Sequence, residues 1–216
     1  MEADAALRLR AGAEKLGCAL SQAQADRLIA YLNLLGKWNR VYNLTAVRAP
    51  AEMLTQHLLD SLSIVQPLQR QLLGGAGRVL DVGSGGGLPG VVLAVAIPQL
   101  DITCVDTVNK KVSFIRQVAL ELQLANLHAV HSRVEAMTAA PFDVVVSRAF
   151  ASLADFVSLT RAQLAPDGVW LAMKGKLPDD EIAALPPGLD VFHVEQLSVP
   201  GLDAERCAVW IRPSRV

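Results

Sequence analysis

The residues best able to bind a cofactor lie in one glycine-rich stretch near the middle of the chain. A β-type run at 78–82 leads into Gly83, Gly85, Gly87 and Gly90, and a helical stretch follows. Glycines let a backbone turn tightly and let a ligand approach closely, because no Cβ stands in the way. In open α/β sheets, ligands bind at the carboxyl ends of the strands. The stretch therefore predicts a cofactor site at the end of this strand.

Two kinds of cofactor fit this stretch. Gly85, Gly87 and Gly90 have the G-x-G-x-x-G spacing of dinucleotide-binding proteins, and Asp106 follows about 20 residues later. Asp81, followed by glycines at alternate positions, is closer to the first motif of S-adenosylmethionine-dependent methyltransferases, where the acid lies near the methionine ammonium. Asp106 can accept hydrogen bonds from ribose hydroxyls in either class, so it does not separate them. We favour S-adenosylmethionine, because we expect seven strands and no second catalytic domain.

Short β-type runs alternate with helical stretches after about residue 73. Five of these runs lie at 78–82, 101–105, 127–131, 142–146 and 168–173. Such alternation predicts parallel βαβ units with right-handed crossovers. Two further runs, 190–199 and 207–212, lie too close for a helical crossover, so we expect them to be antiparallel. The pattern predicts an α/β fold with a seven-stranded, mostly parallel sheet and helices on both faces. This is the Rossmann-like architecture of class I methyltransferases.

The chain divides into two predicted parts. Residues 1–72 form a helical N-terminal extension, and residues 73–216 form the domain that binds S-adenosylmethionine. Within the extension, Leu28, Leu32 and Leu35 recur at helical spacing.

One segment of this extension is basic and aromatic. Between residues 27 and 51 no acid occurs, and Tyr31, Trp38 and Tyr42 are interleaved with basic residues. These are Arg27, Lys37, Arg40 and Arg48. Basic groups beside aromatic rings can hold phosphates and stack bases, so we expect the extension to dock RNA or to act as a lid. A helix with a solvated basic face and a buried aromatic stripe explains the same pattern.

Composition excludes several classes of protein. The chain has 216 residues, 52% of them apolar, and a formal net charge of −1, which favours a folded domain and gives no global argument for nucleic acid. No apolar run reaches the roughly 18 residues that cross a membrane, and the first residues lack the features of a secretory signal. Cys18, Cys104 and Cys207 are isolated, and no cluster has metal-ligand spacing. We expect a cytoplasmic protein without a metal ion or a membrane partner.

Several separated motifs give the chain a more specific resemblance. They are residues 81–90, Trp38-Asn39-x-x-x-Asn43-Leu44-Thr45, His57-Leu58-Leu59-Asp60-Ser61, Lys110-Lys111-x-x-Phe114, Ser147-Arg148-Ala149-Phe150, Met173-Lys174-Gly175 and Val199-Pro200-Gly201-Leu202-Asp203. In this order they resemble the RsmG family, also called glucose-inhibited division protein B, over nearly the whole chain. The resemblance implies a methyltransferase that uses S-adenosylmethionine to modify a guanine N7 in 16S ribosomal RNA. It implies as partner the 16S rRNA within the small subunit or an assembly intermediate, with no obligate protein partner evident.

The resemblance also implies positions for the cofactor contacts. Carried over residue by residue, they fall on Gly83 and Leu88 in the glycine turn, on Val134 and Glu135 after the third strand, and on Arg148 after the fourth. The full predicted cofactor site adds the residues of the first motif and the next strand end, Asp81, Gly85, Gly87 and Asp106.

The chemistry of guanine N7 predicts few catalytic requirements. This nitrogen carries a free lone pair, so its attack on a sulfonium methyl group needs no general base, and we expect alignment and electrostatics to supply catalysis. We therefore assign no catalytic residue. Arg148 and Lys174 are candidates for positioning the substrate. An ion pair with a helix acid is the alternative, structural explanation for Arg148, and a solvated strand end is the alternative for Lys174. Asn39, Asn43, His57 and Lys174 are candidates for substrate binding, although capping, turn formation or packing also explain the first three.

Two other functions stay open from the sequence. One is a methyltransferase that acts on a small molecule or a protein, and the other is a nicotinamide-dependent oxidoreductase.

Overall fold

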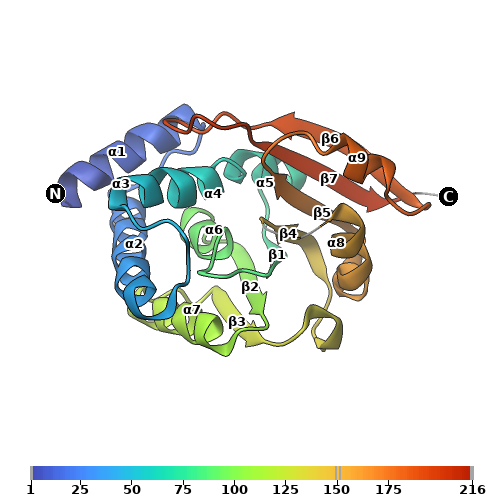
Figure 1. The fold of residues 1–216 in the computed structure, drawn as a ribbon, viewed down its shortest axis with the longest axis horizontal. Coiled ribbons are helices and arrows are strands. Elements are labelled where there is room, and N and C mark those ends of the chain that lie inside the picture. The colour runs from blue at the N-terminus through green and yellow to red at the C-terminus, as the bar shows by residue number, and fades with distance from the viewer. Residues whose placement is uncertain (1, 149, 151, 215–216) are drawn as a thin grey trace.

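The computed structural model describes residues 2–148, 150 and 152–214, and in this part of the chain seven strands form one sheet. In chain order they are β1 (Gly77–Val82), β2 (Leu100–Asp106), β3 (Leu127–His131), β4 (Phe142–Ser147), β5 (Leu164–Lys174), β6 (Leu189–Gln196) and β7 (Cys207–Pro213). Their order across the sheet is β3-β2-β1-β4-β5-β7-β6 (Figure 1). Each strand lies at a run that the sequence predicts as β, so the predicted seven-stranded sheet is confirmed.

The strand directions also follow the prediction. β1 pairs in parallel with β2 and β4, β2 with β3, and β4 with β5. β7 lies between β5 and β6 and is antiparallel to both, as expected for a pair without a helical crossover. β5 begins at Leu164, before the run predicted to start at residue 168, because Leu164 pairs with Phe142 beyond a register shift.

Helices and helical turns connect the strands. The helices are α1 (Glu2–Lys15), α2 (Gln22–Tyr42), α3 (Pro50–Met53), α4 (Asp60–Leu62), α5 (Val65–Gln71), α6 (Gly90–Ala96), α7 (Asn109–Glu121), α8 (Leu153–Thr160) and α9 (Asp179–Ala183). A π-helical turn, η1 (Leu54–Leu59), joins α3 to α4, and the 3-10 turns are η2 (Val134–Ala136) and η3 (Arg161–Gln163). α2 begins with a capping box, because the Gln24 N–H donates to Ser21 Oγ and the Ser21 N–H donates to Gln24 Oε1.

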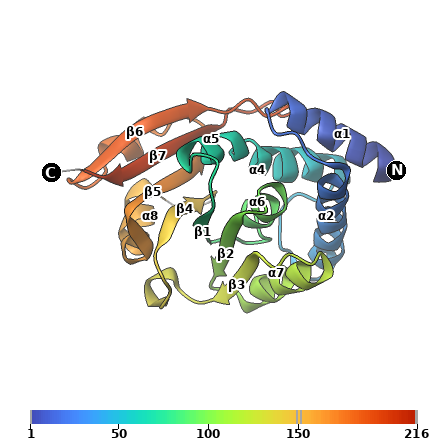
Figure 2. The same ribbon diagram turned by 180° about the vertical axis from the view of Figure 1, so that it is seen from behind.

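The two faces of the sheet pack against different groups of helices (Figures 1 and 2). Successive strand residues point to opposite faces. Val79 and Val144 therefore lie in a core that includes residues of α1, α2, α6 and α7, whereas Leu80 and Val145 lie in a core that includes residues of α8. Helices on both faces are what the alternating sequence pattern predicts.

Helix α2 packs directly on this larger core. Tyr31 is fully buried, and its ring centroid lies 6.2 Å from that of Phe114 in α7. The Trp38 ring lies 5.4 Å from Phe114 and 5.1 Å from Tyr42. Tyr31 and Trp38 thus pack against the domain, as the structural explanation of the pattern predicts, whereas Tyr42 contacts Trp38 but is itself exposed. The predicted parts 1–72 and 73–216 share one core.

Two further observations concern the described residues as a group. None of their helices combines the length and apolarity needed to cross a membrane. No three of their His, Cys, Asp and Glu side chains lie close enough together to share a metal ion.

Candidate active site

A cavity of about 460 Å³ opens at the carboxyl ends of β1 and β2. Gly83 lines it from the glycine turn, Asp106 from the end of β2, and Val134 and Glu135 from η2. Four of the predicted cofactor residues, from three separate segments, therefore meet at one cavity. Its place in the sheet is where open α/β folds bind their ligands.

The glycine turn has a backbone that only glycine adopts easily. Gly83, Gly85 and Gly87 have φ angles of 68°, 57° and 90°. A Cβ on Gly83 would meet nothing within 4 Å, so this position borders open space. A Cβ on Gly87 would lie 2.4 Å from Cγ2 of Val91, so that glycine is needed for α6 to pack against the turn. The turn thus combines an open wall toward the cavity with a tightly packed base.

Asp106 is held in a fixed orientation by the backbone around it. Its Oδ2 accepts a hydrogen bond from the Gly85 N–H at 2.9 Å, and its Oδ1 accepts one from the Val108 N–H at 2.8 Å. The Lys111 ammonium group, which also lines the cavity, lies 3.8 Å from Oδ2. Each carboxylate oxygen can accept more than one hydrogen bond. Asp106 therefore keeps the capacity to bind two hydroxyl groups.

Asp81 lies beneath the turn and does not line the cavity. Its fully buried carboxylate accepts hydrogen bonds at Oδ2 from the Gly90 N–H (2.8 Å) and from Cys104 Sγ–H (3.9 Å). Its Oδ1 is buried without a hydrogen-bond partner among the described residues. Burial raises the pKa of Asp81 from 3.8 to about 7, although the Gly90 hydrogen bond and the charge of Arg148 oppose the rise. A buried carboxylate oxygen without a hydrogen-bond donor would be stabilised by an ammonium group.

The other predicted cofactor residues have different places. The Val134 carbonyl oxygen accepts a hydrogen bond from Gln163 Nε2 at 2.9 Å, which fixes η2 beside the cavity. Gly85, Gly87 and Leu88 are in the turn but are not among the residues that line the cavity. Arg148 lines a different cavity, described next.

A second cavity, of about 400 Å³, lies at the carboxyl ends of β4 and β5. Its walls come from the ends of these strands, from η1 and α4, and from the loop that follows α2. Arg148 lines this cavity, and Phe150, two residues further along the chain, lines the first one. The segment that follows β4 therefore lies between the two cavities.

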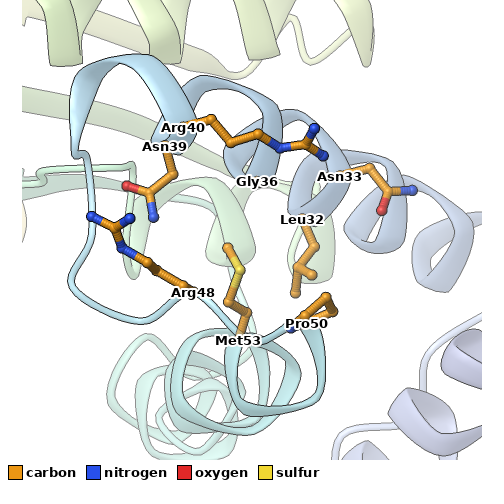
Figure 3. Close-up of a pocket in the computed structure, with 8 residues that line it drawn as sticks. All are labelled: Leu32, Asn33, Gly36, Asn39, Arg40, Arg48, Pro50 and Met53. Atoms are coloured by element: carbon orange, nitrogen blue, oxygen red, sulfur yellow. The ribbon is translucent and has the colours of Figure 1, made fainter.

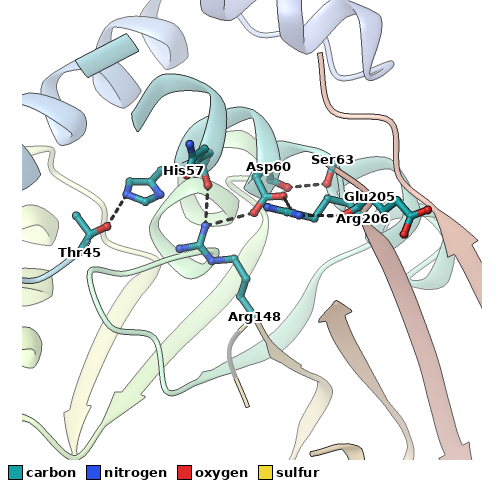
Figure 4. A network of polar contacts seen from close by, with 8 residues as sticks. Thr45, His57, Asp60, Ser63, Arg148, Glu205 and Arg206 are labelled. Carbon is teal, nitrogen blue, oxygen red and sulfur yellow. Dashed lines mark hydrogen bonds and ion pairs between the residues drawn. The ribbon is translucent and has the colours of Figure 1, made fainter. Parts of the chain in front are cut away.

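Asp60 holds two arginines at the edge of the second cavity (Figure 4). Its Oδ1 accepts a hydrogen bond from Arg206 Nε at 2.9 Å, and Arg148 Nη1 lies 3.4 Å from its Oδ2. Arg148 Nη1 also donates to the Gln56 carbonyl oxygen at 3.0 Å. The structural explanation for Arg148, an ion pair with a helix acid, is therefore what the structure contains. The same side chain nonetheless faces the cavity.

His57 is a neutral group in this cavity. It is 3% exposed, and its Nε2 shares a hydrogen bond of 2.9 Å with Thr45 Oγ1. Burial, with the nearby charge of Arg148, lowers the pKa of His57 to about 4. Its Nδ1 is buried without a hydrogen-bond partner in the part of the chain described. His57 therefore adds no charge to the cavity at neutral pH.

Lys174 lies at the end of β5 and lines the same cavity. Its Nζ donates to both carboxylate oxygens of Glu181, at 3.0 and 2.8 Å, and only 15% of its side chain is exposed. The interpretation of Lys174 as a solvated strand end is therefore wrong, because its side chain is largely buried and forms an ion pair with Glu181 of α9. Both predicted positioning cations have carboxylate partners.

The two asparagines of the predicted substrate site shape the loop after α2. Asn39 is 4% exposed, and its side chain accepts from the Thr45 N–H and donates to the Val47 carbonyl oxygen. Asn43 ends α2 in the left-handed conformation, and its Oδ1 accepts from Arg48 Nη2 at 3.1 Å. Both therefore have the capping and turn roles that are usual for asparagine. Asn39 and Asn43 are absent from the lining of the second cavity, whereas His57 and Lys174 belong to it.

Sequence reasoning missed three residues that complete these cavities. Arg206 lies in the connection between β6 and β7 and belongs to none of the motifs. Gln56 contributes a backbone carbonyl group, which no side-chain pattern reveals. Lys111 was part of a recognised motif, and its place one turn into the helix after Asp106 could have indicated its contact with that carboxylate.

The topology of the sheet separates the two cofactor classes. Dinucleotide-binding sheets have the strand order 3-2-1-4-5-6, whereas here an antiparallel β7 lies between β5 and β6. Asp106 at the first cavity suits a ligand with ribose hydroxyls, and Asp81 is the acid that the first methyltransferase motif places at the end of this strand. This combination favours S-adenosylmethionine over a nicotinamide cofactor.

Comparisons with known proteins give a consistent result. The family model described as rRNA small subunit methyltransferase G matches residues 24–209. Ribosomal RNA small subunit methyltransferase G of Methylibium petroleiphilum is 61% identical over 203 residues, covering 94% of this chain and 92% of that protein. The protein of the same name from Paracidovorax citrulli is 62% identical, with 96% and 89% covered.

Solved structures share the fold at low identity. TrmN from Thermus thermophilus has a TM-score of 0.57 at 19% identity, covering 74% of this chain and 53% of that one. MtNAS in complex with MTA and tNA has a TM-score of 0.56 at 14% identity, covering 90% and 75%. Together with the strand order, these neighbours show that the fold is that of a class I methyltransferase.

Proposed function

The chain belongs to the rRNA small subunit methyltransferase G family, and from this premise we propose that it transfers the methyl group of S-adenosylmethionine to N7 of a guanine in 16S rRNA. One observation supports the proposal above all. A cavity suited to a nucleoside cofactor and a second, polar cavity lie at the carboxyl ends of paired parallel strands, and Arg148 lines one of them while Phe150 lines the other. That arrangement lets a donor and an acceptor approach each other from two sides.

The first cavity would hold the cofactor. Asp106 would accept hydrogen bonds from the ribose hydroxyls, and Val134 and Glu135 would lie beside the adenine. The open backbone at Gly83 would allow close approach of the cofactor, and Asp81 would support the turn from beneath through the hydrogen bond that it accepts from the Gly90 N–H. S-adenosylmethionine supplies an electrophilic methyl group on a sulfonium centre when it is bound.

The second cavity would hold the guanine and would therefore be the catalytic cavity. Its N7 needs no deprotonation, and this agrees with a cavity whose histidine is neutral and hydrogen-bonded to Thr45. Arg148 and Lys174 offer hydrogen-bond donors suited to guanine O6 and to a neighbouring phosphate. Their task is to orient the base, because alignment of the reacting atoms supplies a large part of the rate.

Asp60 would set the electrostatics of this cavity. Methyl transfer places a positive charge on the purine, which nearby uncompensated arginines would oppose. The Asp60 carboxylate contacts both Arg148 and Arg206, so it offsets their charge while leaving their remaining N–H groups as donors. We therefore assign the three residues a joint positioning role.

The proposal extends to the setting of the reaction. We infer that the substrate is 16S rRNA within the small subunit or an assembly intermediate, in the bacterial cytoplasm. We further propose that residues 1–72 dock the RNA, while residues 73–216 bind the cofactor.

The test is methyl transfer from labelled S-adenosylmethionine to small ribosomal subunits that lack this modification. Label in the 16S rRNA is expected, and label on ribosomal protein or on small molecules of an extract would instead support the alternative substrate classes. The Gly87→Asp variant serves as the negative control, because any side chain at Gly87 collides with Val91 and disrupts the turn.

A further inference from the structure

A third cavity, of about 190 Å³, lies between α2 and α3 and is distinct from the two cavities of the candidate active site (Figure 3). Leu32 and Gly36 of α2 and Pro50 and Met53 of α3 line it. Arg40 reaches it from α2, and Arg48 reaches it from the loop between the helices. Figure 3 shows the apolar side chains of Leu32, Pro50 and Met53 together, with the Arg40 guanidinium group on the side of Asn33 and the Arg48 guanidinium group on the opposite side, near Asn39. The cavity thus joins an apolar wall to a basic edge.

The charge of this cavity is not compensated. No carboxylate is among the described residues that line it, and neither Arg40 nor Arg48 forms an ion pair in the described part of the chain. Among the described residues, the Arg48 guanidinium group donates to the neutral Asn43 side chain. By contrast, Arg148 and Lys174 in the catalytic cavity are both paired with carboxylates. Two exposed arginines at opposite sides of the cavity, without a carboxylate partner among the described residues, attract anions, and guanidinium groups suit phosphate geometry well.

Gly36 has no structural reason to be a glycine. It lies in the interior of the long helix α2 with an ordinary negative φ, and a Cβ there would meet nothing within 4 Å. Glycine in a helix interior costs stability relative to alanine. Gly36 lines the cavity, so its lack of a side chain keeps the helix surface open at this point. A ligand that lies against the helix backbone would account for the glycine.

One short loop forms a wall of both this cavity and the catalytic cavity. Thr45 and Val47 face the catalytic cavity, and Arg48 faces the third cavity. Asn39 fixes the loop by hydrogen bonds to the backbone of Thr45 and Val47, and Asn39 itself lines the third cavity. A strand of RNA whose guanine enters the catalytic cavity would therefore cross this loop, and its adjoining nucleotide would reach the third cavity.

We propose that this third cavity is a subsite for a nucleotide that flanks the target guanine. Arg40 and Arg48 hold the two phosphates on either side of this nucleotide, and its sugar or base lies over Gly36 against Leu32 and Met53. The proposal rests on the proposed function, because it assigns a second contact to the same RNA substrate. It also gives the basic segment of the N-terminal helices a defined ligand.

The first experiment measures methyl transfer to small subunits as a function of subunit and salt concentration. Arg40→Gln and Arg48→Gln should each raise the KM for subunits about ten-fold, with kcat nearly unchanged, because a charged hydrogen bond is lost. Each should also reduce the slope of log affinity against log salt by about one. Arg161→Gln in η3, outside residues 1–72, removes the same charge from another exposed arginine and should change neither value.

The outcomes separate this proposal from the proposed function. Normal KM and salt slope in both variants, with active wild-type protein, would overturn the subsite alone. Failure of the wild-type protein to methylate subunits would instead overturn the proposed function. An equal effect of Arg161→Gln would also overturn the subsite, because the arginines would then act only through net charge.

The second experiment fills the cavity without removing charge. Gly36→Ala and Gly36→Leu should keep or raise the melting temperature, by about 2–4 °C for alanine, because the helix interior loses a glycine. Both should weaken binding to subunits, and leucine more than alanine. S-adenosylmethionine affinity should stay unchanged in both. A stabilised Gly36→Leu protein that binds subunits like the wild type would contradict the subsite.

Discussion

The Tyr31 hydroxyl group donates a hydrogen bond of 2.6 Å to the backbone carbonyl oxygen of Gly86. Tyr31 is fully buried in α2, and Gly86 is part of the glycine turn after β1. Leu35, one helical turn after Tyr31, lies so close that a Cβ on Gly86 would be 3.0 Å from its Cδ1. Helix α2 therefore supports the backbone of the glycine turn by packing against it.

The Tyr31→Phe variant tests this support. It leaves a buried carbonyl group without its donor, which should lower the free energy of unfolding by about 1–3 kcal/mol and weaken cofactor binding. Urea unfolding and calorimetric titration with S-adenosylmethionine measure the two effects. Tyr42→Phe, at an exposed tyrosine of the same helix, is the matched control. Equal stability of Tyr31→Phe and Tyr42→Phe would show that the hydrogen bond contributes nothing.

The Asp106→Asn variant tests the ribose contact. Its amide keeps one acceptor but loses the charge that strengthens bonds from hydroxyl donors, so the Kd for S-adenosylmethionine should rise about 10- to 100-fold. Asp101→Asn, at the other end of β2, removes a half-exposed carboxylate that pairs with Arg78 and His128. This control should bind the cofactor normally, because surface pairs contribute little. Unchanged affinity in Asp106→Asn would place the ribose elsewhere.

Asp81 should make the folded protein less stable as pH rises. Its pKa is about 7 in the folded protein and near 3.8 when unfolded. Between these values the folded state holds a proton that the unfolded state has lost, so stability falls from about pH 4 to pH 7 and then levels off.

Unfolding by urea at several pH values, compared between wild type and Asp81→Asn, measures this contribution. The unfolding free energy of the wild type, relative to that of Asp81→Asn, should fall as pH rises to about 7 and then stay constant. The titration of His57, which acts in the opposite direction, is common to both proteins and cancels. A difference independent of pH would mean that Asp81 is ionised throughout.

The Asp60→Asn variant tests the joint role of Asp60, Arg148 and Arg206. It should lower kcat for methyl transfer by about ten-fold or more while leaving S-adenosylmethionine binding nearly intact, because the arginines lose their alignment. Asp190→Asn, which breaks the Arg212 pair on β6 and β7, is the control and should keep full activity. Losses from Asp60→Asn and Arg148→Met should be less than additive in the double variant. Fully additive losses would show that the two residues act independently.

The sheet could be predicted well because the sequence patterns that indicate strands are local. Each β-type run depends on a few neighbouring residues, and each reappears as a strand in the structure. The glycine turn and Asp106 were predictable for the same reason, since the ends of parallel strands meet at one edge of a sheet.

The contents of the second cavity could not be predicted in this way. Asp60 and Arg206 are separated by 146 residues, and their pairing depends on β7 being inserted beside β5. The burial of Asp81 and the contribution of the Gln56 carbonyl group likewise depend on packing. Side-chain type and spacing along the sequence do not predict such contacts.

The most direct test of the account is to locate the modified base in cells. A bacterial strain that lacks its own gene of this family is complemented with this chain, and its 16S rRNA is treated with borohydride and aniline, which cleave at N7-methylguanosine. We predict cleavage at one guanine with the wild-type chain and none with Asp106→Asn expressed at the same level. Absence of cleavage with a folded wild-type chain that binds S-adenosylmethionine would contradict the assignment of guanine N7 as the methyl acceptor.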